Sequence, residues 1–178
     1  MDEHLRQLID GLSSKDGMAR MRAREALVLR GDAAGPVLRA AAAGLDKRLR
    51  WEAIKALAAL VDPVGLEGFL ALLDDPESDL RWLAAGGLIA LGPRSARPVL
   101  QALTVPALTR GRLEMSRRIL GDLAADNKVL ADLLSPLMQV ISGNDLAVVN
   151  ARAARALADL DHATGHPPDP SLLQPADG

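Results

Sequence analysis

Apolar residues recur along this chain every three or four positions, in blocks that repeat at a nearly constant interval. The two clearest blocks read LRWEAIKALAALV (Leu49–Val61) and LRWLAAGGLIALG (Leu80–Gly92), and they begin 31 residues apart. At 100° per residue, one arc of the first block holds the apolar residues Leu49, Ala53, Ala56, Leu57 and Leu60. This spacing predicts an amphipathic helix whose apolar stripe faces a core.

The same pattern continues outside these blocks. One column of leucines aligns the copies, with a longer last step of 37 residues: Leu27, Leu57, Leu88, Leu120 and Leu157. The segments between copies also match, since Gly35–Ala40 (GPVLRA) resembles Arg97–Ala102 (RPVLQA). Each repeat is therefore predicted to contain two helices, and the chain to contain about five repeats. The first helices are expected near residues 3–14, 33–44, 63–74, 94–105 and 127–142, and the second helices near 17–30, 47–61, 77–91, 109–125 and 145–160.

The repeated phrase apolar-Arg-x-x-Ala-x-x-Ala/Gly-Leu-x-x-Leu ends in glycine at Gly31 and Gly92. It resembles the HEAT repeat, in particular the short bacterial type found in phycobilisome lyases. The resemblance covers roughly residues 3 to 161 and implies an all-α fold, an α-solenoid of about five two-helix repeats with a concave face lined by the second helices. It does not imply one activity, because such repeats serve many functions. We expect residues 1–161 to form the solenoid and residues 162–178, which hold four prolines, to form a flexible tail.

Composition bears on the cellular location of the protein and on its possible ligands. The chain has no cysteine, which excludes disulfides and thiolate chemistry and favours a cytoplasmic location. Its first twenty residues lack the apolar run of a secretory signal, and no run of apolar residues is long enough to predict a membrane span. The net charge of −2 gives no global attraction to nucleic acid or anionic lipid.

The sequence offers few candidates for metal-binding or catalytic residues. The three histidines are His4 in the first helix and His162 and His166 near the end, and no cysteine joins them as a ligand. The sequence contains no phosphate-binding loop, nucleophile elbow or Ser/His/Asp grouping. We therefore expect no metal, no cofactor and no enzymatic activity.

Acid and arginine residues recur four positions apart at the start of the second helices. This spacing places the two charges on one helix face and favours a structural ladder that links neighbouring repeats over a catalytic role. The ladder would consist of Asp16 with Arg20, Asp46 with Arg50, and Glu77 with Arg81.

The helix face opposite the apolar arc is the more informative candidate. In the first three repeats it carries apolar side chains, two of them tryptophans, and exposed apolar surface and tryptophan are typical of binding sites. We therefore predict that a protein or peptide partner binds the concave face through Met21, Val28, Trp51, Lys55, Trp82, Ile89, Glu114, Arg117 and Arg118. Two alternatives stay open: the rings seal the seams between repeats, or the strip is a homodimer interface.

Two further functions are weighed against partner binding. Arginines cluster in the first repeat (Arg20, Arg22, Arg24 and Arg30) and in the fourth (Arg110, Arg112, Arg117 and Arg118), as in HEAT-like proteins that bind DNA. The 23 acidic residues that offset 21 basic ones disfavour nucleic acid. The third function is that of a lyase-like accessory subunit, which holds a chromophore or a second subunit.

Overall fold

The computed structural model describes residues 3–61, 65–143 and 145–165 of the chain. In these residues all regular structure is helical, with ten α-helices, α1–α10, and the short 3-10 helices η1 and η3. This result confirms the all-α prediction. The chain forms two compact units, Met1–Gly92 and Pro93–Gly178, which are called unit 1 and unit 2.

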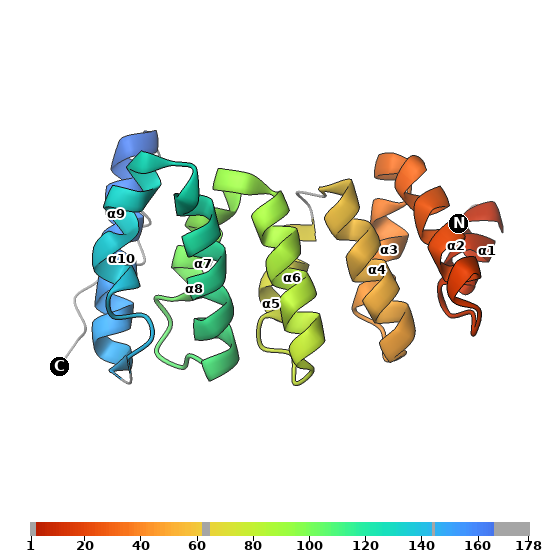
Figure 1. The fold of residues 1–178 in the computed structure, drawn as a ribbon, viewed down its shortest axis with the longest axis horizontal. Coiled ribbons are helices and arrows are strands. Elements are labelled where there is room, and N and C mark those ends of the chain that lie inside the picture. Colours follow the sequence, from red (N-terminus) through yellow and green to blue (C-terminus); the bar gives the residue numbers. More distant parts are fainter. Residues whose placement is uncertain (1–2, 62–64, 144, 166–178) are drawn as a thin grey trace. The chain divides into compact units, whose positions relative to one another are not determined.

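Unit 1 contains the first six helices in two layers. In one layer, α4 packs between α2 and α6. The other layer places α1 on α2, α3 on α4 and α5 on α6, and Figure 1 shows the α2–α4–α6 layer nearest the viewer. The bounds are α1 (Glu3–Leu12), α2 (Gly17–Leu29), η1 (Gly31–Ala33), α3 (Gly35–Ala42), α4 (Lys47–Leu60), α5 (Leu66–Leu72) and α6 (Ser78–Ala90).

Capping side chains set where two second helices of unit 1, α2 and α4, begin. Asp16 caps α2, because its carboxylate accepts a hydrogen bond from the Met18 backbone N–H at 2.9 Å. Asp46 caps α4 in the same way and accepts from the N–H groups of Arg48 and Leu49 at 2.9 and 3.0 Å. These bonds satisfy amides that a helix end leaves unpaired. Both helices consequently begin at the residue that the sequence predicted.

The column of leucines found in the sequence lies in the core. All five side chains are 0 to 3% exposed: Leu27, Leu57, Leu88, Leu120 and Leu157. Phe69 packs against Gly87, where a Cβ would lie 2.7 Å from the ring. The buried arc of α4 differs from the prediction, since Ile54 is buried while Leu49 and Leu60 are half-buried. The reason is that α4 has helices on both sides as well as beneath it.

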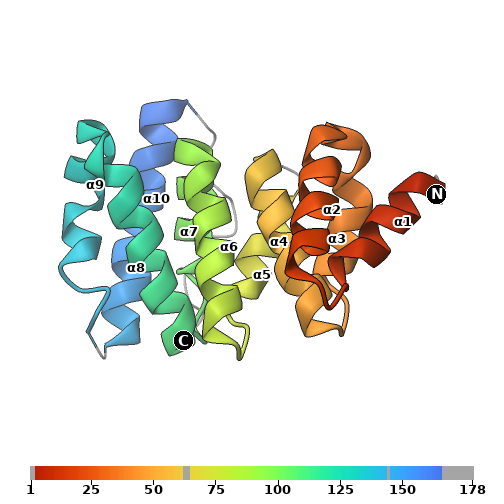
Figure 2. The same cartoon turned by 45° about the vertical axis from the view of Figure 1, so that its right-hand side comes forward.

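Unit 2 departs from the predicted repeat pattern. Its four helices pack as a closed ring, in which α7 contacts α8, α8 contacts α9, α9 contacts α10 and α10 returns to α7. Figure 2 shows α10 next to α7. The sequence had placed the last helix in a row of second helices that continues along α8, and the α7–α10 packing corrects this expectation. The bounds are η3 (Gly92–Ser95), α7 (Ala96–Ala102), α8 (Arg110–Ala125), α9 (Lys128–Met138) and α10 (Leu146–Thr164).

Two polar contacts hold α10 against α7. Asn150 occupies the column that carries arginine in the first three repeats, and its amide donates to the Leu103 and Val105 carbonyls at 2.6 and 2.9 Å. The Arg97 guanidinium on α7 donates to both carboxylate oxygens of Asp161 on α10, at 2.7 and 3.3 Å. Asp161 is 2% exposed, so this pair lies inside unit 2. The changed column and the buried pair explain why α10 leaves the repeat pattern.

The C-terminal boundary also differs from the prediction. Helix α10 continues to Thr164, four residues beyond the expected end at residue 160. Gly165 then ends the helix with a left-handed backbone at φ 70°, a conformation that glycine adopts without steric cost. The first residues of the expected tail are therefore helical, and residues 166–178 lie outside the described part of the chain.

Candidate functional site

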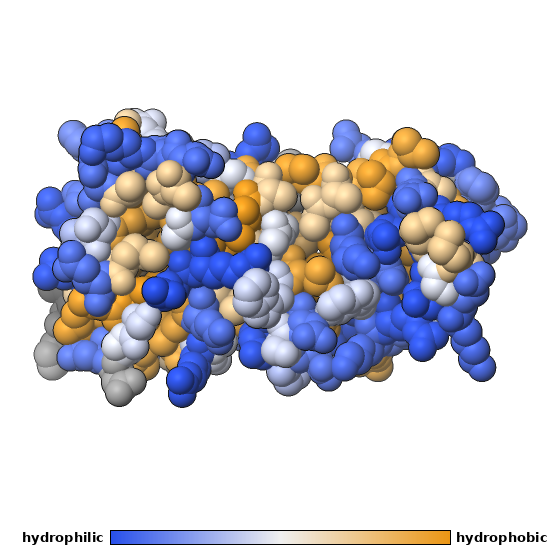
Figure 3. Space-filling model, viewed as in Figure 1, coloured by the Kyte–Doolittle hydropathy of each residue, from blue (hydrophilic) through white to orange (hydrophobic). Residues whose placement is uncertain are grey.

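The predicted partner-binding residues of the first three repeats all lie on the α2–α4–α6 layer of unit 1. We call this surface the tryptophan face, and it carries Met21, Val28, Trp51, Lys55, Trp82 and Ile89. Trp82 is 51% exposed, whereas the other five side chains are half-buried. Figure 3 shows apolar side chains gathered over α4 and α6 on this side, with hydrophilic side chains around them.

One apolar member of this surface, Met18, was not predicted from the sequence. Met18 is 55% exposed and lies one helical turn before Met21 on α2. A spacing of three residues places both side chains on neighbouring parts of one helix face. That spacing was available in the sequence, but the repeat column of Met18 holds Arg48 and Asp79 in the next two repeats and so gave no apolar signal.

Gly86 leaves the backbone of α6 uncovered by a side chain on the tryptophan face. It lies four residues after Trp82 and three before Ile89, so all three share one side of the helix. A Cβ at Gly86 would have no atom within 4 Å, whereas a Cβ at Gly87 would collide with Phe69. Glycine within a helix lowers stability by about 0.5–1 kcal/mol relative to alanine. Packing inside unit 1 explains Gly87 but offers no reason for Gly86.

A cavity of about 400 Å³ lies at one end of the tryptophan face. Its walls come from α2, α4 and α6, and its lining is mostly charged: Arg20, Lys47, Arg48, Trp51, Glu52 and Asp79. The Trp51 ring therefore borders charged groups as well as the apolar strip. This arrangement suits a ligand with an apolar surface and a polar edge.

Glu52 is the charged group at the centre of this region, although no sequence pattern predicted it. Glu52 is 6% exposed, and its carboxylate accepts hydrogen bonds from Arg20, at 3.4 Å, and from Arg24. Arg20 also donates to the backbone carbonyls of Ser14 and Lys15 at 2.8 and 3.1 Å. One buried carboxylate thus joins α4 to two guanidinium groups of α2. Two members of the first arginine cluster, Arg20 and Arg24, therefore have their partner inside unit 1.

The acids and arginines of the expected ladder make different contacts from those predicted. Asp16 and Asp46 cap their own helices. Arg50 forms an ion pair with Asp75, in the loop before α6. Arg81 donates to the backbone carbonyl of Asp75 at 2.8 Å and to that of Pro76 at 3.2 Å. The arginine column therefore links a helix to a loop, rather than to the acid four residues earlier.

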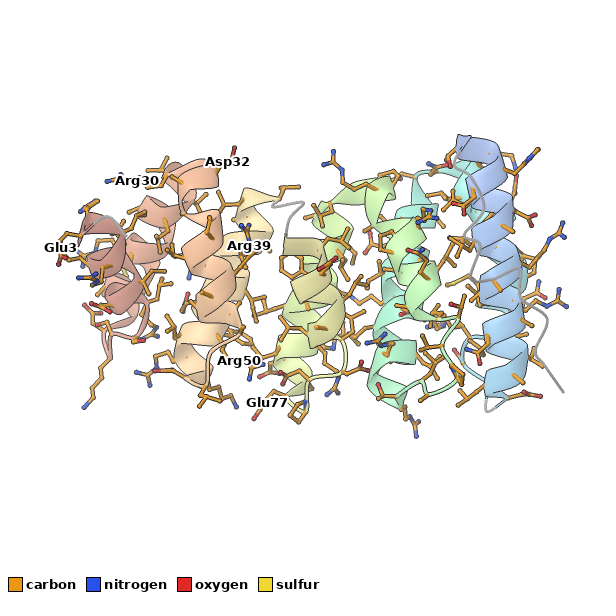
Figure 4. The ribbon with its side chains drawn as sticks, turned by 180° about the vertical axis from the view of Figure 1, so that it is seen from behind. Glu3, Arg30, Asp32, Arg39, Arg50 and Glu77 are labelled. Carbon is orange, nitrogen blue, oxygen red and sulfur yellow. The ribbon has the colours of Figure 1, made fainter. Side chains whose placement is uncertain are left out.

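The remaining acid of the ladder, Glu77, contacts the neighbouring repeat. Its carboxylate accepts a hydrogen bond from the Lys47 ammonium at 2.7 Å. This hydrogen bond and the charge of Glu77 raise the pKa of Lys47 above its ordinary value of 10.5. Figure 4 shows Glu77 and Arg50 at the same edge of unit 1. Ionic contacts thus do join α4 to the loop at the start of α6, through partners 25 and 30 residues apart.

The other predicted residues belong to unit 2. Glu114, Arg117 and Arg118 lie on α8; the first two are exposed and Arg118 is half-buried. Glu114 and Arg117 line a cavity of about 520 Å³, and Arg118 does not. The described residues of the lining are Leu108, Arg110, Leu113, Glu114, Arg117, Ile141, Ser142, Gly143 and Leu146. The predicted residues are therefore divided between the two units.

No known protein family matches this chain, and no curated protein has a significantly similar sequence. Among the described residues, no three His, Cys, Asp or Glu side chains come together as a metal site would need. His4 lies on α1 and His162 on α10, and His166 lies outside those residues. None of the described helices has both the length and the apolar composition that a membrane crossing requires.

Proposed function

We propose that this protein is a HEAT-like binding module without catalytic activity, which holds a protein or peptide partner on the tryptophan face. The observation that carries the proposal is the half-exposed ring of Trp82, on the same helix layer as Trp51 and next to the uncovered backbone at Gly86. Tryptophan is among the side chains that most often anchor an interface. The absence of cysteine supports a cytoplasmic setting for this interaction.

The partner segment that fits this surface has an apolar side and approaches α6 closely. An amphipathic helix or an extended strand binds in this way, with its apolar side chains against the rings and its backbone near a small residue. Gly86 leaves room for that approach. Arg48 and Asp79 at the charged end would contact the polar edge of the partner.

Nucleic acid is the less favoured ligand for unit 1. Phosphate binding needs cations that are available to the ligand. Arg20 and Arg24 instead neutralise Glu52, and the Nε of Arg22 donates to the Met18 carbonyl at 3.3 Å. A partner held by apolar contacts should stay bound as salt is raised, whereas phosphate binding should weaken steeply.

The test is a comparative affinity purification with three full-length baits. These are the wild type, the double variant Trp51→Ala/Trp82→Ala, and the control Leu45→Ala. Leu45 is fully exposed, lies in the loop before α4 and lines none of the described cavities. We expect proteins that the wild type and the control both retain to be lost from the double variant. For a partner so identified, the affinity should fall by about 2 kcal/mol or more.

The stability of the double variant decides between the two interpretations of the rings. If the tryptophans bind a partner, their loss should lower the free energy of unfolding much less than a core Leu→Ala change does. A strongly destabilised double variant that still retains the partner would show that the rings seal the seams. Loss of a dimer in light scattering, with no other partner affected, would identify a second copy of the chain as the occupant.

A further inference from the structure

The cavity of unit 2 combines an apolar wall with two arginines that have no partner among the described residues. Its apolar lining comes from Leu108, Leu113, Ile141 and Leu146, at the start of α8, after α9 and at the start of α10. Arg110 and Arg117 lie seven residues apart on α8, which places them on nearly the same side of the helix, about 10 Å apart along its axis.

Neither arginine is neutralised by the described part of unit 2. Arg110 and Arg117 are both exposed, and neither makes a hydrogen bond or an ion pair with a described residue. Glu114 lies between them on the same helix and also lines the cavity, so the lining carries one surplus positive charge. An apolar wall with a surplus guanidinium fits a peptide segment that carries aliphatic side chains and a carboxylate.

The sequence of this chain contains such a segment. Residues 166–178 read HPPDPSLLQPADG, with two aspartates, two leucines and no lysine or arginine. Residues 93–165 hold nine basic and seven acidic residues, so the charges of the two parts are complementary. The four prolines leave few backbone amides that could join a helix or sheet, so side chains would make most of the contacts.

The segment is also long enough to reach the cavity. It follows the C-terminal end of α10, whereas the cavity lies at the N-terminal end of the same helix. The 19 residues of α10 span about 28 Å. An extended chain advances about 3.3 Å per residue, so Leu173, eight residues after Gly165, can travel about 26 Å. Asp177 can reach farther, past the level of both arginines.

We infer that residues 166–178 bind in the cavity of unit 2 of their own chain. Leu172 and Leu173 lie against the apolar wall, and Asp177 pairs with Arg110 or Arg117. The cavity is thus a binding site for an acidic, leucine-bearing segment, and an external ligand of the same chemistry would have to displace it. This inference concerns a different surface from the tryptophan face and does not depend on the partner proposed there.

The test uses the full chain, which has no cysteine, so Gln174→Cys creates a single position for a nitroxide spin label. Leucine and isoleucine methyl signals are then recorded by NMR with the label oxidised and reduced. We expect strong paramagnetic broadening at Leu113, Ile141 and Leu146. Broadening that is absent there, or that falls on the tryptophan face instead, would overturn the inference.

Charge reversal tests the pairing. Arg110→Glu with Arg117→Glu should lower the equilibrium constant for docking by about tenfold, because the cavity then repels the acidic segment that it attracted. Arg94→Glu with Lys128→Glu makes the same change in net charge on η3 and α9, outside the cavity lining, and should leave the broadening intact. Equal broadening in both double variants would refute the assigned role of the arginines.

A mixed sample separates docking within one chain from docking between chains. Spin-labelled chains without isotope are mixed with isotope-labelled chains that carry no spin label. We expect no broadening in this mixture. Broadening at the cavity methyls in the mixture would assign the segment to the cavity of a second copy and overturn the intramolecular inference.

Discussion

Alanine at Gly86 should stabilise unit 1 and weaken partner binding at the same time. Its Cβ would meet no atom within 4 Å, so the substitution adds no clash and removes the conformational freedom of glycine in the unfolded chain. The expected gain is about 0.5–1 kcal/mol in the free energy of unfolding. The same methyl group would occupy the place where we propose that the partner backbone approaches α6.

Two neighbouring glycines provide matched controls. Gly87→Ala should destabilise unit 1 by about 1–2 kcal/mol, because its Cβ would lie 2.7–2.9 Å from three ring atoms of Phe69. Gly68 on α5 is exposed and has open space at its Cβ, like Gly86. Gly68→Ala should therefore stabilise unit 1 to a similar extent without affecting the partner.

The two tryptophans of the chain, Trp51 and Trp82, both lie in unit 1, so tryptophan fluorescence in urea reports the unfolding of this unit. With a urea dependence of about 2 kcal/mol per molar, Gly86→Ala should raise the midpoint by about 0.25–0.5 M. A lowered midpoint would refute the packing argument. A raised midpoint with unchanged partner affinity would refute the proposed approach at Gly86.

The remaining predictions concern the core and the ion pairs. Leu57→Ala should destabilise unit 1 by about 2–5 kcal/mol in urea unfolding, whereas Leu45→Ala, at an exposed position, should have almost no effect. Glu52→Ala should destabilise unit 1 by about 1–3 kcal/mol, because two guanidinium groups lose their buried partner. If this loss of stability fell to zero in 1 M salt, the result would contradict this reason. The Lys47–Glu77 contact raises the pKa of Lys47 above 10.5, so its contribution is complete below pH 10.5 and disappears as the pH rises through the higher pKa of the folded state. The difference in unfolding free energy between the wild type and Lys47→Met should therefore shrink above pH 10.5, and a constant difference would count against the ion pair.

The helices and the buried column of leucines could be predicted from the sequence, because both depend on local signals. Cap residues such as Asp46 and the spacing of the leucines act within a few turns of one helix. The placement of Trp51 and Trp82 on the α2–α4–α6 layer, opposite the buried leucines, followed from the same periodicity. Their binding role stays a prediction, because periodicity assigns a side chain to a face and does not identify what contacts that face.

The charged contacts were not readable in the same way. Glu52 pairs with arginines 28 and 32 residues away, and Asp161 pairs with an arginine 64 residues away. A search for charges four residues apart on one helix cannot find such partners. The sequence contains a weaker indication of the helix ring in unit 2. The last repeat step lengthens to 37 residues, and Asn150 replaces the arginine of the earlier repeats. Both changes coincide with the helix that packs on α7.

The closed ring of unit 2 affects the order in which the chain can fold as it leaves the ribosome. In unit 1, α2 packs on α4 and α4 on α6, so each new helix finds a neighbour that has just been synthesised. Domains generally fold during synthesis from the N-terminus. Unit 2 cannot close until Asp161 has emerged and can meet Arg97, which was made 64 residues earlier. A nascent chain stalled inside α10 would therefore carry a folded unit 1 and an exposed apolar side of α7, a surface prone to aggregation.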